Sequence, residues 1–188
     1  ATAILITPLR NPALLAKTAA SLDVISKGRL ELGVGLGWQK EEFDAAGVSF
    51  EGRSEIFWET LDICKTLWQD SPASFKGNHF NFDDIWCHPQ PIQGQNIPLL
   101  FGLKMTHENA DKIAKVGHGW IPIKTSRDFI SEGKEILFDA FIKEGRQDQP
   151  RIRGQLPTCL DDNGVPNIDL TLKELEKSMA AGLDEIEV

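Results

Sequence analysis

Short apolar runs alternate with longer amphipathic segments along most of the chain. Six of the runs have the length and composition of buried β-strands. They cover residues 4–6, 29–36, 97–102, 120–123, 152–160 and 183–188. Five of the segments between them carry apolar residues at helical spacing and predict α-helices. These segments cover residues 11–28, 53–69, 108–116, 129–144 and 172–182.

Local signals support several of these boundaries. Asn11 followed by Pro12 is typical of a helix start, and Gly28 is typical of a helix end. In the last helix, three apolar residues are expected to face inward. They are Leu172, Leu175 and Met179.

Residues 71–96 interrupt the alternation. Within them, residues 74–82 predict a β-hairpin that turns at Gly77 and Asn78, and residues 87–93 predict a loop stiffened by prolines. Elsewhere, the strand–helix–strand order predicts a parallel sheet with right-handed crossovers. Two α/β architectures satisfy this order: an open doubly wound sheet, or part of a (β/α)₈ barrel.

Composition narrows the class of protein. The 188 residues carry a net charge of −8, and 41% of them are hydrophobic and 26% charged, as in a soluble folded domain. This balance argues against a disordered chain and against a basic nucleic-acid-binding protein. No apolar run is long enough to predict a membrane span, and the three cysteines form no disulfide pattern, so we expect a cytoplasmic protein. The chain is shorter than a closed (β/α)₈ barrel, which has at least about 200 residues.

The glycine-rich stretch after the second strand has three interpretations. Residues 33–38 read Gly-Val-Gly-Leu-Gly-Trp, whereas the dinucleotide-binding fingerprint is GxGxxG opening directly into a helix. The small residues could instead let the strand end pack closely. The third interpretation is a cofactor pocket at the carboxyl end of the strand, which Trp38 would line.

Two other strand-to-helix loops have the composition of a phosphate site. Residues 102–106 and 124–126 combine lysines with hydroxyl side chains ahead of a helix, where backbone N–H groups bind anions. Ordinary connecting loops are the alternative. The four histidines lack metal-ligand spacing, so no metal site is expected, and no catalytic residue is assigned.

Several sequence blocks, in this order and spacing, resemble the luciferase-like monooxygenase superfamily, and most closely its deazaflavin (coenzyme F-420)-dependent oxidoreductases. The blocks cover residues 8–12, 21–30, 33–38, 42–43, 47–48, 75–77, 89–93 and 117–120. The resemblance implies a (β/α)₈ TIM-barrel fold that is incomplete: residues 1–188 would be a single partial barrel domain. They would supply strands three to eight, with the first two βα units missing and residues 71–96 inserted between helix four and strand five.

The resemblance also implies a cofactor site at the carboxyl ends of the strands. Thr7 would follow strand three, and Gly37 and Trp38 would follow strand four. Gly102 and Leu103 match a Gly-Gly turn of the family, with leucine in place of the second glycine, and Thr106 lies near a hydroxyl position. Thr125 and Ser126 fall where relatives bind the cofactor phosphate.

The function implied by the resemblance is hydride transfer between coenzyme F-420 and a small organic substrate. An FMN-dependent monooxygenase is the first alternative. A truncated barrel fragment or subunit without catalysis of its own is the second, and an NAD-binding dehydrogenase is a third. Exposed edges of an incomplete barrel favour association, so a homo-oligomer, most simply a dimer, is expected.

Overall fold

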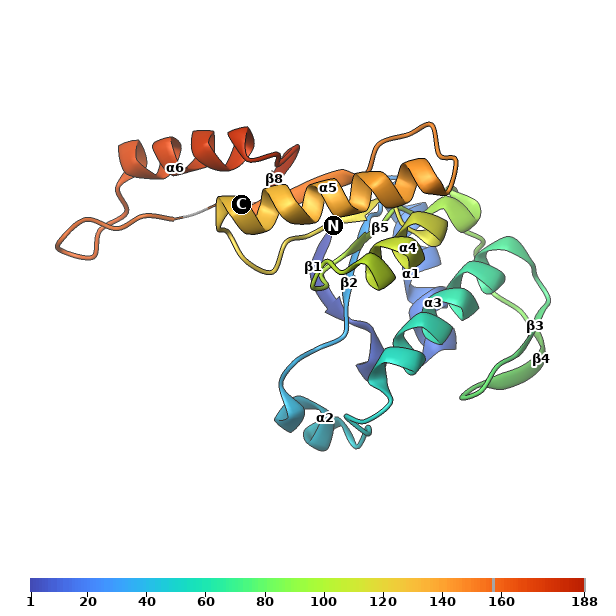
Figure 1. Ribbon diagram of the computed structural model, residues 1–188. Helices are drawn as coiled ribbons and strands as arrows, with labels where there is room; N and C mark the ends of the chain where they lie inside the picture. The colour runs from blue at the N-terminus through green and yellow to red at the C-terminus, as the bar shows by residue number, and fades with distance from the viewer. Residues whose placement is uncertain (157, 188) are drawn as a thin grey trace. The chain divides into compact units, whose positions relative to one another are not determined.

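The computed structural model of the protein describes residues 1–156 and 158–187 (Figure 1). The chain divides into two compact units, Ala1–Pro98 and Leu99–Val188. Within each unit, successive parallel strands are joined through a helix, as the sequence predicts. Among the described residues, no helix combines the length and apolar character needed to cross a bilayer.

The first unit is built on two parallel strands, β1 (Thr2–Ile6) and β2 (Leu32–Gly35). The register is interrupted between Thr2 and Leu5, and the peptide bond between Ala3 and Ile4 is cis. Beyond the interruption the pairing is regular, with Ile6 opposite Gly35. The two strands therefore end side by side at one edge.

Helix α1 (Pro12–Ile25) packs on α3 (Arg53–Gln69) through small side chains. Ala16 is fully buried, and its carbonyl accepts a 2.9 Å hydrogen bond from the indole N–H of Trp68. The predicted cap is confirmed, because Asn11 accepts the N–H of Leu14 at 3.1 Å. Close helix approach through alanines leaves the larger residues on the other side of α1.

The outer side of α1 is apolar and uncovered within the described part of the chain. Leu14 and Ile25 are 66% and 76% exposed, and Leu22 is also exposed. These residues produced the helical spacing in the sequence, yet the buried side of the helix is its alanine side.

Each strand of the first unit is followed by a short element: η1 (Thr7–Leu9) comes after β1, and α2 (Lys40–Ala46) comes after β2. The apolar spacing predicted no helix between residues 37 and 52, yet the short helix α2 lies there. It has a single fully buried side chain, Phe43, so it carries no apolar repeat that a pattern search could detect. The element η1 is a 3₁₀ turn that precedes α1.

The hairpin predicted in residues 74–82 is confirmed. β3 (Ala73–Lys76) pairs antiparallel with β4 (Asn81–Ile85), and the turn between them is fixed by Glu59 from α3. Both carboxylate oxygens of Glu59 accept hydrogen bonds from the backbone N–H groups of residues 78–80, at 2.7–3.2 Å. The hairpin is thereby tied to the helix.

A buried carboxylate fixes the loop that follows the hairpin. Asp23 at the end of α1 is fully buried and accepts the backbone N–H of Gln93 at 2.9 Å and its side-chain amide at 2.8 Å. The same amide donates to the carbonyl of Leu30 at 2.9 Å. A short 3₁₀ turn, η2 (Gly94–Asn96), follows Gln93.

The second unit is a four-stranded parallel sheet with three helices. Its strands, in spatial order, are β5 (Leu99–Phe101), β6 (Gly119–Trp120), β7 (Arg151–Gln155) and β8 (Glu185–Glu187). The helices are α4 (His107–Val116), α5 (Arg127–Lys143) and α6 (Ile168–Ala180). The predicted strand over residues 152–160 ends at Gln155 instead, and Pro157 and Val188 lie outside the described residues.

The two faces of this sheet differ in chemistry. Trp120 faces α5, because a Cβ on Gly133 of that helix would approach its ring to 2.3 Å. Ile152 is the register partner of Trp120 and shares its face. Side chains alternate along a strand, so Arg151 and Arg153 lie on the opposite face.

The inward orientation expected for the apolar residues of the last helix is wrong. Leu172 and Met179 of α6 are 50% and 42% exposed, whereas Ser178 is buried. Ile168, Leu172 and Met179 follow one side of the helix and are exposed, whereas Leu175 is half-buried.

Candidate functional site

The carboxyl edge of the first unit brings together three of the residues expected at the cofactor site. Ile6 pairs with Gly35, so the chain leaves β1 at Thr7 and β2 at Leu36 from the same edge. Thr7 is fully buried, and its hydroxyl donates to the carbonyl of Leu5 at 3.4 Å. Its side chain therefore belongs to the packed support of this edge, and its backbone forms the start of η1.

Gly37 is required by the packing of this edge. Its φ of +75° is rarely adopted by residues with a side chain, and a Cβ there would approach the Cγ2 of Ile6 to 2.8 Å and the ring of Phe43 to 2.9 Å. Close packing by small residues was one of the alternatives that the sequence left open.

Trp38 is the most open side chain of this edge. Its indole is 83% exposed, directly after the turn at Gly37. An uncovered indole at the carboxyl end of a parallel strand is suited to contact a bound organic molecule. Trp38 thus presents apolar surface at this edge, while Thr7 and Gly37 support the edge.

The carboxyl edge of the second unit carries the other five residues. Phe101 and Trp120 are register partners, so the loops after β5 and β6 leave the sheet together. Leu103 is buried, and its carbonyl accepts the indole N–H of Trp120 at 2.8 Å. This leucine packs in the core and leaves no glycine-like cradle for a phosphate beside Gly102.

The two helix N-termini at this edge are satisfied differently. Thr106 caps α4, because its hydroxyl accepts the N–H of Asn109 at 3.2 Å. Ser126 occupies the same position before α5, but within the described residues its side chain makes no capping bond. Thr125 and Ser126 are both exposed. The first turn of α5 therefore has backbone donors free to bind an anion.

Cationic side chains flank this uncapped turn. Lys124 and Arg127 are exposed on either side of Thr125 and Ser126, and the Lys124 ammonium lies 5.7 Å from the centroid of the Phe129 ring. A phosphate-bearing group fits this turn better than the turn at Gly102 and Leu103. The acidic Asp128 lies within the same first turn and partly offsets the charge.

An ion-pair network on the face of the second sheet opposite to Trp120 was missed by sequence reasoning. Arg153 donates to Glu185 at 2.7 Å through Nε, and Arg151 donates to the other oxygen of the same carboxylate. The hydrogen bond from Arg151 has the largest effect on Glu185, and together with that from Arg153 it holds the pKa of Glu185 below its usual range. Burial of the carboxylate acts in the opposite direction. The sequence signal was the alternation of Arg151, Ile152 and Arg153, which places two arginines on one face of a strand.

The other titratable candidates have structural surroundings. His118 lies at the amino end of β6, where its Nδ1 accepts the N–H of Leu99 at 3.3 Å. Burial raises the pKa of the Cys64 and Cys87 thiols, which disfavours the reactive thiolate. Within residues 1–156 and 158–187, no group of three metal-ligating side chains converges.

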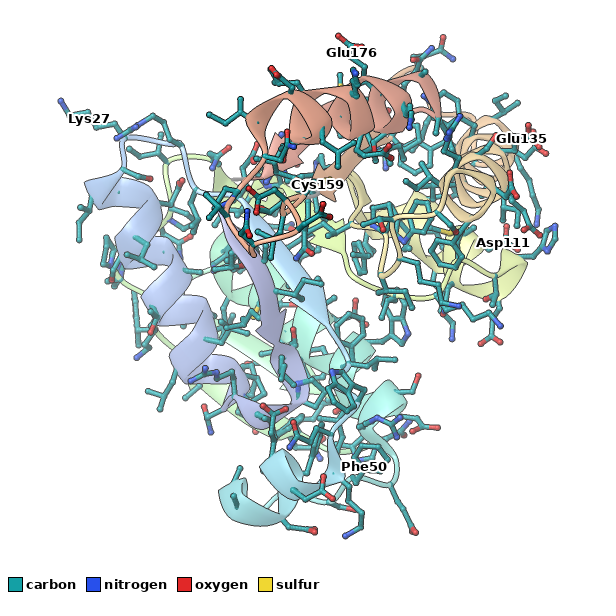
Figure 2. All side chains as sticks on the ribbon, turned by 90° about the vertical axis from the view of Figure 1, so that its left-hand side faces the viewer. Lys27, Phe50, Asp111, Glu135, Cys159 and Glu176 are labelled. Atoms are coloured by element: carbon teal, nitrogen blue, oxygen red, sulfur yellow. The ribbon has the colours of Figure 1, made fainter. Side chains whose placement is uncertain are left out.

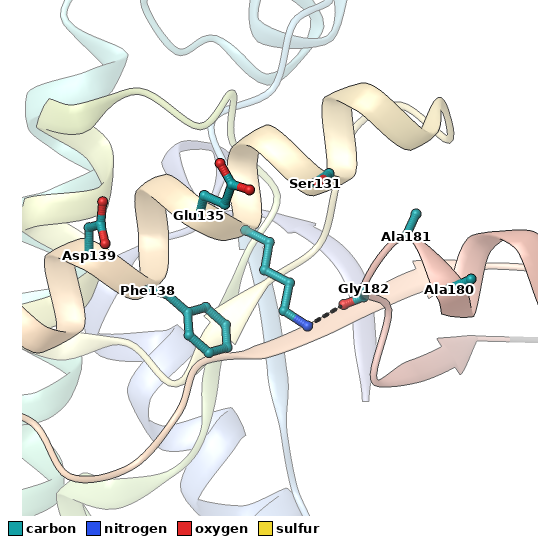
Figure 3. Close-up of a pocket in the computed structure, with 8 residues that line it drawn as sticks. Ser131, Glu135, Phe138, Asp139, Ala180, Ala181 and Gly182 are labelled. Carbon is teal, nitrogen blue, oxygen red and sulfur yellow. Dashed lines mark hydrogen bonds between the residues drawn. The ribbon is translucent and has the colours of Figure 1, made fainter.

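A hollow of about 560 Å³ lies beside α5, and none of the residues that line it belongs to a loop after the carboxyl end of a strand. It is formed by α5 and the turn that leads into β8, where Lys134 donates to the carbonyl of Gly182 at 3.1 Å (Figure 3). Active sites of parallel barrels are built from the loops at the carboxyl ends of the strands. The hollow is therefore not the candidate site.

Comparison with known proteins identifies the family. The profile of the luciferase-like monooxygenase family matches residues 1–164, so the chain belongs to this family. An uncharacterized protein of Mycobacterium bovis is 35% identical over 168 residues, which are 89% of this chain and 57% of that protein. The chain thus spans a little over half the length of this curated relative.

Solved structures show the same fold. A coenzyme F420-dependent tetrahydromethanopterin reductase from Methanopyrus kandleri aligns with a TM-score of 0.77 and 15% identity, over 94% of this chain and 73% of its own. The oxygenating constituent of 3,6-diketocamphane monooxygenase from Pseudomonas putida, in complex with FMN, aligns with a TM-score of 0.70 and 18% identity. That match covers 85% of this chain and 48% of the other. The expected fold class is confirmed: an α/β fold of the incomplete TIM-barrel type.

Proposed function

We propose that the chain forms part of an oxidoreductase that binds coenzyme F-420 or FMN and transfers a hydride between that cofactor and a small organic substrate. The observation that carries the proposal is the uncapped first turn of α5, with exposed Thr125 and Ser126 between Lys124 and Arg127. Both cofactors carry a phosphate that is joined to a flat ring system through a ribityl chain. When bound, the cofactor supplies the redox chemistry.

Each residue of the site has a distinct role in this proposal. Ser126 and the backbone N–H groups after it bind the phosphate, and Thr125 offers a second hydroxyl. Trp38 supplies apolar surface, and Gly37 and Thr7 hold the edge from which it projects. Gly102 and Thr106 shape the neighbouring loop, whereas Leu103 contributes packing only. Residues 71–96 form the inserted segment of the barrel.

An FMN-dependent monooxygenase is the second candidate. It is supported by the FMN-bound monooxygenase among the structures of the same fold. The phosphate-binding turn serves either cofactor equally, so the choice between them depends on ring chemistry. A subunit or fragment without catalysis of its own is the third candidate.

Binding of the pure cofactors tests the proposal. FMN, coenzyme F-420 and NADH are titrated separately into the protein, and heat of binding is measured by calorimetry. We expect saturable binding of F-420 or FMN and none of NADH. Tight binding of FMN alone would favour the monooxygenase, and binding of neither would reject both enzymatic candidates.

We further propose that the protein is a cytoplasmic homo-oligomer, most simply a dimer. The uncovered apolar side of α1, with Leu14, Leu22 and Ile25, supports association, because an apolar helix side exposed to water gains free energy when it is covered.

A further inference from the structure

We propose that Arg53 is a positioning residue that holds residues 38–52, here called the wall segment, at the carboxyl edge of the first unit. The inference rests on the proposed function, since the wall segment begins with Trp38. It assigns a role to a residue that no sequence motif singled out. We also infer that the wall segment favours flat, non-anionic substrates.

The side chain of Arg53 binds both ends of the wall segment. Arg53 is the first residue of α3, and its Nε donates to the carbonyl of Gly37 at 3.3 Å. Its Nη1 donates to the carbonyl of Phe50 at 3.1 Å. One planar guanidinium therefore joins the residue before the segment to a residue near its end. A lysine lacks this planar, fixed arrangement of donors, so it would hold the two carbonyls less well.

Aromatic contacts complete this clasp. The guanidinium of Arg53 lies over the Phe50 ring, 3.7 Å from its centroid. Phe50 in turn meets the buried Phe43 of α2 edge to face, with ring centroids 5.1 Å apart. Figure 2 labels Phe50 beside the helix and loop of this segment. The clasp thus connects α2, the turn at Gly37 and the start of α3.

The wall segment has few other points of attachment. Of residues 38–52, all of which the structure describes, Phe43 alone is fully buried. The segment follows Gly37 and ends at Gly52, whose φ angles are +75° and +73°. A segment with so little buried surface opens locally at low cost, so removal of one clasp is expected to have a large local effect.

Arg53 sets the direction of Trp38. The carbonyl that Arg53 binds belongs to Gly37, so the bond fixes the peptide plane that leads into Trp38. The exposed indole is the part of the wall segment best suited to contact a flat ring.

Charge on the wall segment disfavours anionic substrates. It carries four carboxylates, from Glu41, Glu42, Asp44 and Glu51. Its single lysine, Lys40, is already paired with Asp44 at 2.7 Å. The net negative charge repels anions from this side of the site. A flat, neutral or cationic organic molecule is the substrate class that fits.

Hydrogen exchange of the backbone amides tests the clasp. Arg53→Lys is compared with Arg29→Lys, because Arg29 also donates from Nε to a carbonyl, that of Ser26 at 2.8 Å, but lies at the amino end of β2. We expect amides of residues 38–52 to exchange about tenfold faster in Arg53→Lys, as loss of a hydrogen bond to a charged group predicts, and to be unchanged in Arg29→Lys. Equal exchange in the two variants would overturn the clasp.

The emission of bound FMN tests the positioning role. A nearby indole quenches flavin fluorescence, so Trp38→Phe gives the emission without that contact. We expect Arg53→Lys to shift emission toward the Trp38→Phe value, with the dissociation constant of FMN changed less than about threefold. Arg29→Lys should match the wild type. A merely structural role of Arg53 would lower the melting temperature and leave the emission of bound FMN unchanged.

The outcomes separate this inference from the proposed function. Faster exchange in Arg53→Lys with unaltered FMN emission overturns the positioning role and leaves the proposed function standing. A wild-type chain that binds neither FMN nor F-420 overturns the proposed function and the role of the wall segment together. The exchange result then still decides whether Arg53 holds residues 38–52.

Discussion

Single side chains at the second unit's carboxyl edge decide where an anion can bind. Thr106 satisfies the first turn of α4 with its own hydroxyl, whereas Ser126 leaves the first turn of α5 open. Sequence alone ranked the two loops equally, because serine and threonine are both good capping residues. The difference lies in side-chain orientation, which local sequence does not determine.

Ser126→Asp separates helix stability from phosphate binding. An aspartate at this position caps α5 and interacts favourably with the helix dipole, so we expect the protein to gain about 1 kcal/mol of stability. The same negative charge should weaken FMN or F-420 binding about tenfold or more. Thermal unfolding and calorimetric titration measure the two effects. Unchanged cofactor affinity in the stabilised variant would show that the phosphate binds elsewhere.

Glu185 gives the second unit a pH-dependent component of stability. Its pKa is lowered in the folded protein by Arg151 and Arg153, so the folded state binds this proton less readily than the unfolded chain. The stabilisation is fully present above the ordinary glutamate pKa of about 4.3 and is lost as the pH falls through the lower folded-state pKa.

Glu185→Gln should remove this component. We expect the variant to be less stable than the wild type at neutral pH, and the gap to narrow as the pH drops below about 4. Urea unfolding at several pH values measures it. A gap of constant size across that range would mean that the carboxylate charge is not what stabilises β7 against β8.

At the scale of elements, the sequence predicted those with a strong local signal. Helix α3 begins and ends where its apolar spacing indicates, and the hairpin turns where its glycine lies. Helix α2 was missed because Phe43 alone anchors it. The orientation of α6 was wrong because a helical seam shows which residues share a side, but not which neighbour covers them.

Glu59 should stabilise the hairpin without stabilising α3, the helix on which Glu59 lies. Glu59→Gln weakens hydrogen bonds to three backbone N–H groups, so we expect a loss of about 1–2 kcal/mol and faster exchange at residues 78–80. Glu55→Gln, one turn earlier on α3 and exposed, is the matched control. If the amides of residues 78–80 exchange at the same rate in both variants, Glu59 does not anchor the hairpin.

At the scale of the whole chain, the order of short motifs was enough to predict the family and the barrel-type fold. Motifs such as residues 33–38 reflect backbone requirements, as the close packing at Gly37 shows. The cofactor, the substrate and the assembly depend on contacts with other molecules, and these leave weaker local patterns. The exposed side of α1 is an example, because the spacing of its leucines does not show whether they face the core or the solvent.

Association through α1 predicts a specific effect of one substitution. Leu22→Glu places a charge in the middle of the uncovered apolar side, and we expect it to shift the protein toward the monomer. Val165→Glu, at an exposed apolar residue of the second unit, should leave the assembly unchanged. Light scattering coupled to size-exclusion chromatography measures the mass. A wild-type monomer, or equal masses for both variants, would reject α1 as the interface.

The anchoring of the hairpin turn has a consequence for how this region can diverge. Glu59 recognises peptide groups, so Asn78 and His79 are held whatever side chains they carry. Gly77 has no such freedom, because a Cβ there would lie 2.2 Å from the Glu59 carboxylate. The turn is therefore a natural place to diversify a library: two neighbouring positions can be randomised on a fixed backbone, provided that Gly77 and Glu59 are kept.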